Sequence, residues 1–357
     1  MTHDSRILFV CKIRSHFYGP SFGLINSCRF IANALESYGI DCKVVSVVDN
    51  NDIDREIHKF KPTHVFVEAL WVAPSKFKQL IPLHPKLKWY VRVHSNISFL
   101  ANEGMAIEWL REYYEISKSY KSLRLASNSE EFIECFDVAY NIPVEYFPNI
   151  YCPKVEDCDA CSVEDDKGKG KGKDKKHDDD DKKENSNRID IGCFGAIRPM
   201  KNHLNQALAS IAFGNELRAK IHFHINHDRC ESGGDPVLKN LVHAFENTNH
   251  KLVFHPWVDH HDFIRLVKRM EVGLQVSMSE TFNIVAADFV WNDIPFVGSD
   301  EIIWLDRRYK ADANSVESII DKIRFAYKGR KHNAQKVNKE NLEKFNKKST
   351  KIWIDAL

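Results

Sequence analysis

The sequence of 357 residues has no long apolar run. No stretch approaches the roughly 20 apolar residues that a membrane-spanning helix needs. Residues 1–14 hold only a run of five apolar residues, which predicts a first strand and not a signal peptide. A strong excess of one charge is missing as well. The formal net charge is +1 at pH 7, so the composition gives no general attraction to nucleic acid or membranes, although local patches remain open.

The cysteines do not have the pattern of a disulfide framework. There are nine, an odd number, and several fall in predicted strands and helices, such as Cys11, Cys28, Cys42 and Cys193. This pattern favours reduced thiols, and we therefore expect a cytoplasmic protein. The hydrophobic content of 43% and the charged content of 28% are typical of a globular protein with a sizeable core.

Short β-branched runs alternate with amphipathic helical stretches along most of the chain. We expect strands at 6–10, 42–48, 64–70, 88–95 and 122–127, and again at 188–197, 220–226, 251–258 and 271–277. Strands that alternate with helices predict parallel βαβ units. The sequence thus predicts two doubly wound, Rossmann-like α/β domains, at 1–150 and 188–335, and a C-terminal helix at 336–357.

The segment 151–187 between these domains is almost wholly charged or glycine from about Lys154 onward. Such a composition cannot bury enough surface to fold, so we expect a disordered linker or insertion. Cys152, Cys158 and Cys161 could recruit zinc, but a single Cys-x2-Cys without a second pair is a weak signal. We assign no metal there and leave this cluster open.

Ligands of open α/β sheets bind beyond the carboxyl ends of the strands. "YGPSFG" (18–23) follows the first predicted strand, and its glycines, Gly23 included, let the backbone approach a ligand. The loop lacks Gly-x-Gly-x-x-Gly, and a plain turn explains it equally well. In "GAIRPMKNH" (195–203), Arg198 and Lys201 lie three residues apart just before a helix. Two cations at a helix N-terminus predict a diphosphate site.

Two acids flank the start of another predicted helix in "SMSETFNIVAADF" (277–289). Glu280 and Asp288 are eight residues apart, about 2.2 helical turns, so we expect them on roughly the same side. A pair of carboxylates can accept hydrogen bonds from the vicinal hydroxyls of a sugar or a ribose. Asp288 stands among apolar residues, where an unpaired charge is costly.

Four segments together resemble retaining glycosyltransferases of the GT-B fold, of the type called family four. "EVGLQVSMSETFNIVAADFVWNDIPFVGSDEIIWL" resembles the donor-site segment, in which a strand, Ser-x-x-Glu and a second acid precede a Pro-hydrophobic-Val strand. "GCFGAIRPMKNHLNQAL" resembles the phosphate-binding loop, and "SNSEEFIECFDVAYNIPVEYFPNIY" the segment that closes the N-terminal domain. "VRVHS", with His94, resembles the histidine loop on the acceptor side. The resemblance implies two Rossmann-like domains that face a central cleft, with the last helix crossing back to the first domain.

The resemblance also implies roles for single residues. Asp288 would bind the ribose hydroxyls of a nucleotide sugar, and Glu280 and His94 would act at the transferred sugar or the acceptor. Arg198 and Lys201 would hold the diphosphate and stabilise the charge that develops as it leaves. Backbone N–H groups at Phe282 and Asn283 would assist donor binding, and Ile284 is counted with them. Gly23 is a further donor-binding candidate, from the loop at 18–23 and not from the resemblance. Such enzymes generally need no metal.

The chain departs from the family at three places. The second acid is usually Glu and here is Asp288, and the glycines usual after the first Glu are replaced by Thr281 and Asn283. The usual Asn-Gly is Asn149-Ile150. These departures bear on the identity of the donor more than on the fold.

The acceptor and the oligomeric state stay open. A glycan, a small molecule or a hydroxylated DNA base would each supply an acceptor hydroxyl. "KGRKHNAQKVNKENLEKFNKKSTK" (328–351) is rich in lysine and is either a solvated face or a nucleic-acid contact. A sugar-nucleotide epimerase of similar fold and a non-catalytic nucleotide-sugar-binding module are the alternatives to a transferase.

Overall fold

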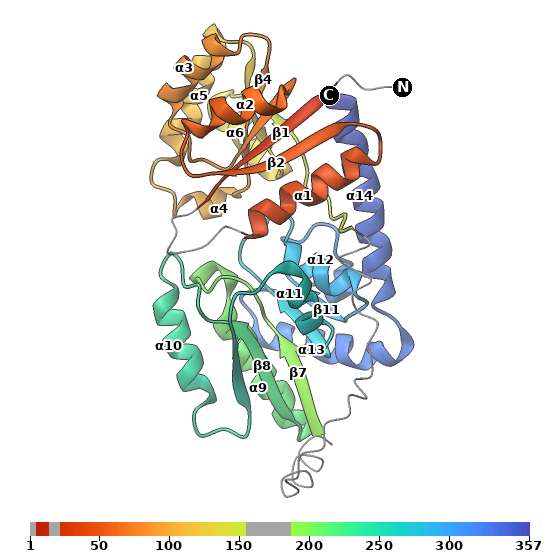
Figure 1. The fold of residues 1–357 in the computed structure, drawn as a ribbon. Helices are drawn as coiled ribbons and strands as arrows, with labels where there is room; N and C mark the ends of the chain where they lie inside the picture. Colours follow the sequence, from red (N-terminus) through yellow and green to blue (C-terminus); the bar gives the residue numbers. More distant parts are fainter. Residues whose placement is uncertain (1–4, 14–21, 155–186) are drawn as a thin grey trace, which may run out of the picture. The chain divides into compact units, whose positions relative to one another are not determined.

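The computed structural model describes residues 5–13, 22–154 and 187–357. The chain divides into two compact units, each drawn in Figure 1. The first unit consists of Met1–Pro153, Ser279–Ile284 and Leu342–Leu357, and the second of Lys154–Met278 and Val285–Asn341. Most of the charged segment, with Cys158 and Cys161, lies outside the described residues.

The first unit is built on a parallel sheet of six strands in the order β2-β1-β3-β4-β5-β6. The strands are β1 (Arg6–Lys12), β2 (Asp41–Val47), β3 (His64–Glu68), β4 (Lys88–Val93), β5 (Leu123–Ser127) and β6 (Val144–Tyr146). All five residues of β3 are buried, because helices cover both faces of a parallel sheet. The first five strands were predicted. β6 was not, because three residues are too few to show a repeat.

Two hydrophobic cores lie on the two faces of this sheet. One is formed with α2 (Asp52–Phe60), α3 (Pro74–Leu83), α5 (Ala106–Ser119) and α6 (Glu130–Tyr140), and the short α4 (Ile97–Leu100) adds to it. The other is formed with α1 (Phe22–Glu36) and the last turns of α14 (Lys336–Ala356). In that second core Trp353 packs against Phe9 and Phe66, and Figure 1 shows the end of α14 beside β1.

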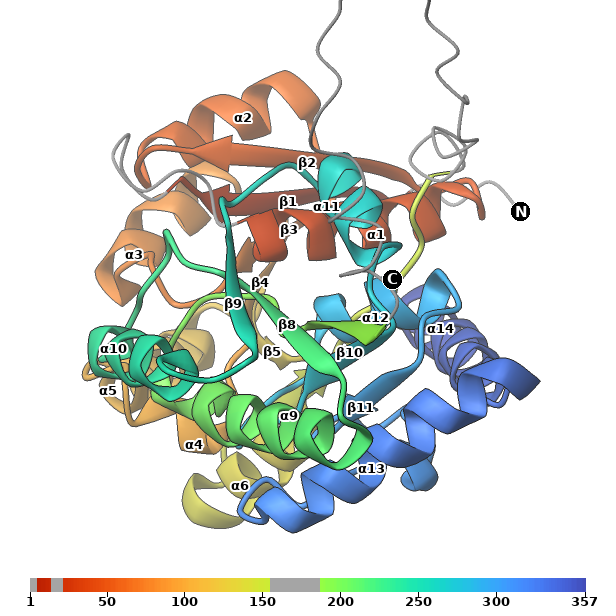
Figure 2. The ribbon, with the colours of Figure 1, turned by 90° about the horizontal axis from the view of Figure 1, so that it is seen from below.

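The second unit is built on a parallel sheet of five strands in the order β11-β10-β7-β8-β9. The strands are β7 (Arg188–Gly192), β8 (Lys220–Asn226), β9 (Lys251–His255), β10 (Val272–Gln275) and β11 (Phe296–Gly298). Figure 2 shows α9 (His203–Leu217), α10 (Gly234–Phe245) and α13 (Val316–Gly329) along one face, with α11 (His260–Val267) and α12 (Ile284–Trp291) on the other. Short 3-10 helices lie at Pro199–Lys201, Arg307–Tyr309 and Arg330–His332.

The close fit of α12 on its sheet depends on glycine. A Cβ atom at Gly273 of β10 would lie 2.5 Å from the ring of Phe289. Phe289 in turn stacks on Phe194 and packs against Phe296. The sequence thus fixes the seat of the helix that carries Asp288. The structure confirms the predicted α/β class with two doubly wound parallel sheets. Among the described residues, no helix combines the length and the apolar character that a membrane crossing requires.

Candidate functional site

The second unit has a topological switch point between β7 and β10. β7 lies between β8 and β10 in the sheet, so the chain leaves β7 to one side and returns on the other. The helices that follow these two strands, α9 and α12, go to opposite faces of the sheet, and open α/β sheets bind ligands at such a point. Arg198 and Lys201 follow β7, and the segment with Glu280 and Asp288 follows β10.

Hydrogen bonds hold these two loops side by side. Asn202 donates through its side-chain amide to the carbonyl oxygen of Val276 over 3.0 Å. The side-chain oxygen of Gln206 accepts from the backbone N–H of Val276 over 2.8 Å. The backbone N–H of Met278 donates to the carbonyl oxygen of Met200, also over 2.8 Å. The backbone at the switch point is therefore fixed by bonds between residues from two distant parts of the sequence.

The two predicted phosphate-binding cations lie in the turn between β7 and α9. Lys201 ends the 3-10 helix Pro199–Lys201, and Arg198 precedes it. Both are half-buried. Nη1 of Arg198 is 3.8 Å from Oε2 of Glu231, which also accepts a hydrogen bond from Arg229 over 2.7 Å. The carboxylate of Glu231 thus offsets part of the positive charge beside the helix N-terminus.

His203, the first residue of α9, is a buried residue that the sequence did not single out. It is fully buried, and neither ring nitrogen has a hydrogen-bond partner among the described residues. Burial, helped by the charges of Lys201 and Arg198, lowers the pKa of His203 to about 3. The ring is therefore neutral at pH 7. A lone histidine in a helical stretch gives no signal in the sequence.

Asp288 is buried on α12 and has a partner from another helix. Its side chain is 2% exposed, and Oδ1 lies 2.7 Å from Nε2 of His260, the first residue of α11. A buried carboxylate needs such a partner because its desolvation is costly. His260 was not predicted, since no local pattern links it to a residue 28 positions away.

Helical spacing does not apply to the two acids, so the premise for expecting them on the same side was wrong. α12 begins only at Ile284, so Glu280 lies in the turn before the helix. Asn283 has a φ of 63°, in the left-handed region, which interrupts the helical geometry. Asparagine tolerates this region better than most residues, so this position does not require glycine. Glu280 also belongs to the first unit and Asp288 to the second.

The segment Ser279–Ile284 packs within the first unit. The hydroxyl of Thr281 donates to the carbonyl oxygen of His94 over 3.2 Å and accepts from the side chain of Asn128 over 3.0 Å. The ring of Phe282 lies 5.7 Å from that of Phe345 on α14. The structure therefore places the turn that carries Glu280 against the loop that carries His94.

Three buried polar residues hold the His94 loop. Glu68 at the end of β3 and Arg92 on β4 have fully buried side chains and form an ion pair over 2.9 Å. Nε2 of His94 contacts the same oxygen of Glu68. Arg92 also donates to Asn149 over 2.5 Å and to the carbonyl oxygen of Phe147 over 2.9 Å. These long-range contacts join the ends of three strands and could not be seen in the sequence.

The charges of this cluster determine the state of His94. Burial raises the pKa of Glu68, but Arg92 and His94 outweigh this effect and hold it below its ordinary value. Burial and Arg92 together lower the pKa of His94, although Glu68 opposes them. At pH 7 the carboxylate is therefore ionised and the imidazole neutral. Because an ionised carboxylate only accepts, Nε2 donates to Glu68 and cannot also accept from Nη1 of Arg92, which lies 3.2 Å away, and Nδ1 keeps a lone pair.

The other predicted residues are placed as follows. Gly23 lies in the first turn of α1, where an added methyl group would meet no atom within 4 Å, and the loop before it lies outside the described residues. Ile284 is the first residue of α12. Cys152 packs at the edge of the second core of the first unit. The lysine-rich tail corresponds to the end of α13 and most of α14, and its contact with nucleic acid stays a prediction.

Comparison with solved structures supports the fold. The N-terminal domain of a trehalose-6-phosphate phosphatase from Candida albicans matches with a TM-score of 0.66 and 13% identity, over 100% of this chain and 97% of that one. A UDP-forming α,α-trehalose-phosphate synthase from Burkholderia vietnamiensis matches with a TM-score of 0.67 and 11% identity, over 99% and 98%. A sucrose-phosphate synthase from Thermosynechococcus elongatus matches with a TM-score of 0.60 and 10% identity, over 98% of both chains.

Comparison of the sequence with known families and proteins does not assign the chain to a family. No protein-family model matches the chain, and no curated protein sequence matches it. At identities of 10–13%, the structural likeness establishes the fold alone. The chain has the GT-B fold.

Proposed function

We propose that this chain is a retaining glycosyltransferase that moves a sugar from a nucleotide-diphosphate sugar to an acceptor hydroxyl. The observation that carries the proposal is the pair of loops at the switch point of the second unit. They combine Arg198, Lys201 and the start of α9 with the segment that leads to Asp288. Two of the structures that share the fold bear names of enzymes that form sugar phosphates, and one is called UDP-forming.

In this proposal the cations act on the leaving group. The bond between the anomeric carbon and the diphosphate oxygen breaks, and the electron pair stays on the phosphate. Arg198, Lys201 and the N–H groups at the start of α9 stabilise this growing negative charge. Because the charge is larger in the transition state than in the ground state, these groups lower the barrier. The acceptor oxygen bonds to the anomeric carbon on the same face. Its proton passes to the departing phosphate, so the step is balanced without a metal.

The acids and the histidine bind the neutral parts of the substrates. Asp288, held by His260, accepts hydrogen bonds from the ribose hydroxyls. Glu280 contacts the transferred sugar. His94 offers the lone pair of Nδ1 to a sugar or acceptor hydroxyl, since Glu68 occupies Nε2. Each of these roles uses hydrogen bonds to hydroxyls, which is the chemistry a nucleotide sugar requires.

Turnover of a panel of UDP-, GDP- and ADP-sugars, with and without acceptors, tests the proposal. The full chain should consume one donor class only when an acceptor hydroxyl is present, and EDTA should not change the rate. Consumption without acceptor would indicate an epimerase or hydrolase. Binding without turnover would indicate a non-catalytic module.

Glu280→Gln tests the role of the first acid. The donor should still bind, while transfer should fall by about 100-fold or more, as expected when a positioned polar group is lost. Glu317→Gln is the matched control, since Glu317 is an exposed acid at the start of α13. Equal transfer by both variants would remove Glu280 from the mechanism.

A further inference from the structure

We propose that Asp54, His58 and His84 form a binding site for a transition-metal ion of the zinc type. All three belong to the first unit, and none is used in the proposed sugar transfer. Two imidazoles and a carboxylate are ligands that suit zinc and its neighbours in the first transition row. The site would therefore be a separate property of the protein.

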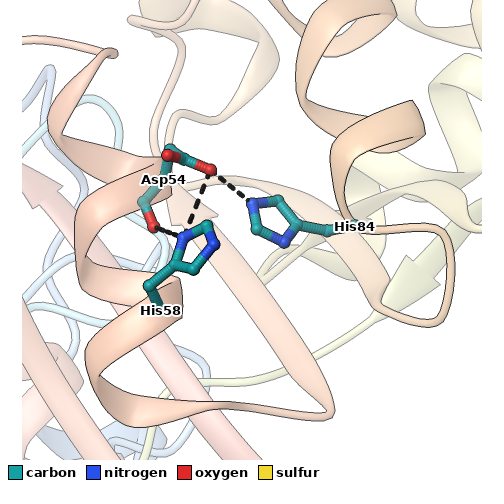
Figure 3. A group of neighbouring side chains, drawn as sticks. All are labelled: Asp54, His58 and His84. Carbon is teal, nitrogen blue, oxygen red and sulfur yellow. Dashed lines mark hydrogen bonds and ion pairs between the residues drawn. The ribbon is translucent and has the colours of Figure 1, made fainter.

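The ligand atoms already converge on one point. Nε2 of His84 is 2.7 Å from Oδ1 of Asp54, and Nδ1 of His58 is 3.5 Å from the same oxygen. Nδ1 of His58 also lies 2.9 Å from the backbone carbonyl oxygen of Asp54, a contact that an ion would replace. One ligand atom from each residue lies within 4.8 Å of the other two. Figure 3 shows both rings turned toward the carboxylate. Ligands of a tetrahedral zinc ion stand about 3.3 Å apart, so the 2.7 Å contact between His84 and Asp54 must lengthen by about 0.6 Å.

The local structure brings these residues together. Asp54 and His58 lie one turn apart on α2, a spacing that puts two side chains on the same face of a helix. His84 is the residue that ends α3, and its backbone N–H bonds to the last turn of that helix. Its side chain is 10% exposed, and its ring lies 6.3 Å from that of the buried Trp89. An ion would thus cross-link α2 to the end of α3 through one largely buried ligand and two exposed ligands.

The charge around Asp54 favours a cation. Among the described residues, its carboxylate takes no hydrogen bond or ion pair from lysine or arginine; its partners are the two imidazoles. The cluster of Asp190, His222 and His224 in the second unit differs in this respect, because Arg188 binds the carboxylate of Asp190 over 2.9 Å. A bound arginine occupies the oxygens that a metal would need. The Asp54 cluster is therefore the better cation site.

Three protein ligands leave a coordination position for water. A metal ion there needs an unprotonated ring nitrogen from each imidazole, so binding displaces any proton that those nitrogens carry. The expected result is a helix-to-helix cross-link that stabilises the first unit whenever the ion is bound.

Calorimetric titration of the full chain with Zn²⁺, followed by Co²⁺ absorption spectra, tests the proposal. The wild type should bind one equivalent of Zn²⁺, and His58→Ala should lower that affinity by about 100-fold or more. Even the loss of a residue that only hydrogen-bonds to a metal ligand typically lowers metal affinity 10–100-fold. Asp54→Asn keeps the shape and removes the charge, and should lower it as well. Both changes are at side chains at least 40% exposed, so neither should prevent folding. The Co²⁺ spectrum of the site should lack the thiolate bands that a cysteine site would give.

His243→Ala is the matched control. His243 is 71% exposed and lies 2.8 Å from Glu246, so it has the same imidazole–carboxylate pair without a third ligand. This variant should bind Zn²⁺ as the wild type does. Unchanged binding in His58→Ala and Asp54→Asn would overturn the proposal, as would a wild type that takes up no Zn²⁺.

Discussion

At the scale of single residues, the ion pair of Glu68 and Arg92 should dominate the stability of the first unit. Both side chains are fully buried, and Glu68→Gln would leave Arg92 without its counter-charge. We expect the free energy of unfolding to fall by about 3–5 kcal/mol in a denaturant titration. Glu145→Gln is the control, because the Arg124–Glu145 pair has the same 2.9 Å distance but its side chains are 46% and 37% exposed. It should cost about 1 kcal/mol or less, and equal losses would contradict the account.

His203 should make the second unit sensitive to acid. The pKa of His203 is about 3 in the fold, below its ordinary value near 6.5, so the unfolded chain binds more protons between these values. The contribution of His203 to the free energy of unfolding is therefore fully present above pH 6.5 and is lost as the pH drops. Between pH 7 and pH 4, the difference in the pKa of His203 between the folded and unfolded chain should lower the free energy of unfolding by about 3 kcal/mol. Unfolding free energies of His203→Gln should fall less steeply with acid than those of the wild type, and the exposed His243→Gln should follow the wild type. Parallel curves for all three would remove His203 as the cause.

The sequence indicated some residues of the candidate site and not others. His94, Arg198, Lys201 and Asp288 stand in segments whose order along the chain can be recognised. Their partners cannot be recognised in this way. Glu68 and His260 reach these residues across 26 and 28 positions, and only the fold brings them together.

At the scale of elements, the seat of α12 on β10 can be tested through glycine. Gly273→Ala would place a methyl group 2.5 Å from the ring of Phe289 and should cost about 1–3 kcal/mol of unfolding free energy. Gly23→Ala is the contrast, since it meets no atom within 4 Å in the first turn of α1. Gly23→Ala should leave the free energy of unfolding nearly unchanged. Under the proposed function it should weaken donor binding. A harmless Gly273→Ala would show that α12 can shift.

Strands were easier to predict than the turns between them. Parallel strands are buried on both faces, so their sequences are nearly continuous apolar runs that stand out. The helix α12 was predicted, but the helical spacing of Glu280 and Asp288 was not valid, because Glu280 precedes the helix and Asn283 has a left-handed conformation. Asparagine adopts the left-handed conformation only in a minority of cases, so an asparagine in the sequence does not predict that conformation.

At the scale of the whole molecule, two α/β halves follow from the alternation of strands and helices, whereas the return of the C-terminal helix to the first domain was implied only by the family resemblance. The first unit includes Leu342–Leu357, whose Trp353 is fully buried and donates to the carbonyl oxygen of Pro148 over 2.8 Å. Trp353→Ala should lower the unfolding free energy of the first unit by about 3–5 kcal/mol. The exposed Lys351→Ala on the same helix should change it by about 0.5 kcal/mol or less. Similar values for both would show that α14 does not support the unit.

The central claim is that the switch point of the second unit binds the nucleotide diphosphate of a sugar donor. Calorimetric titration with UDP, GDP and ADP tests it most directly, using the wild type, Lys201→Met and the exposed control Lys239→Met. We expect the wild type and Lys239→Met to bind one of the three nucleotides. Lys201→Met should bind it about 10- to 100-fold more weakly, which corresponds to a lost charge-assisted hydrogen bond. Binding of none of the three, or equal binding by both variants, would contradict the account.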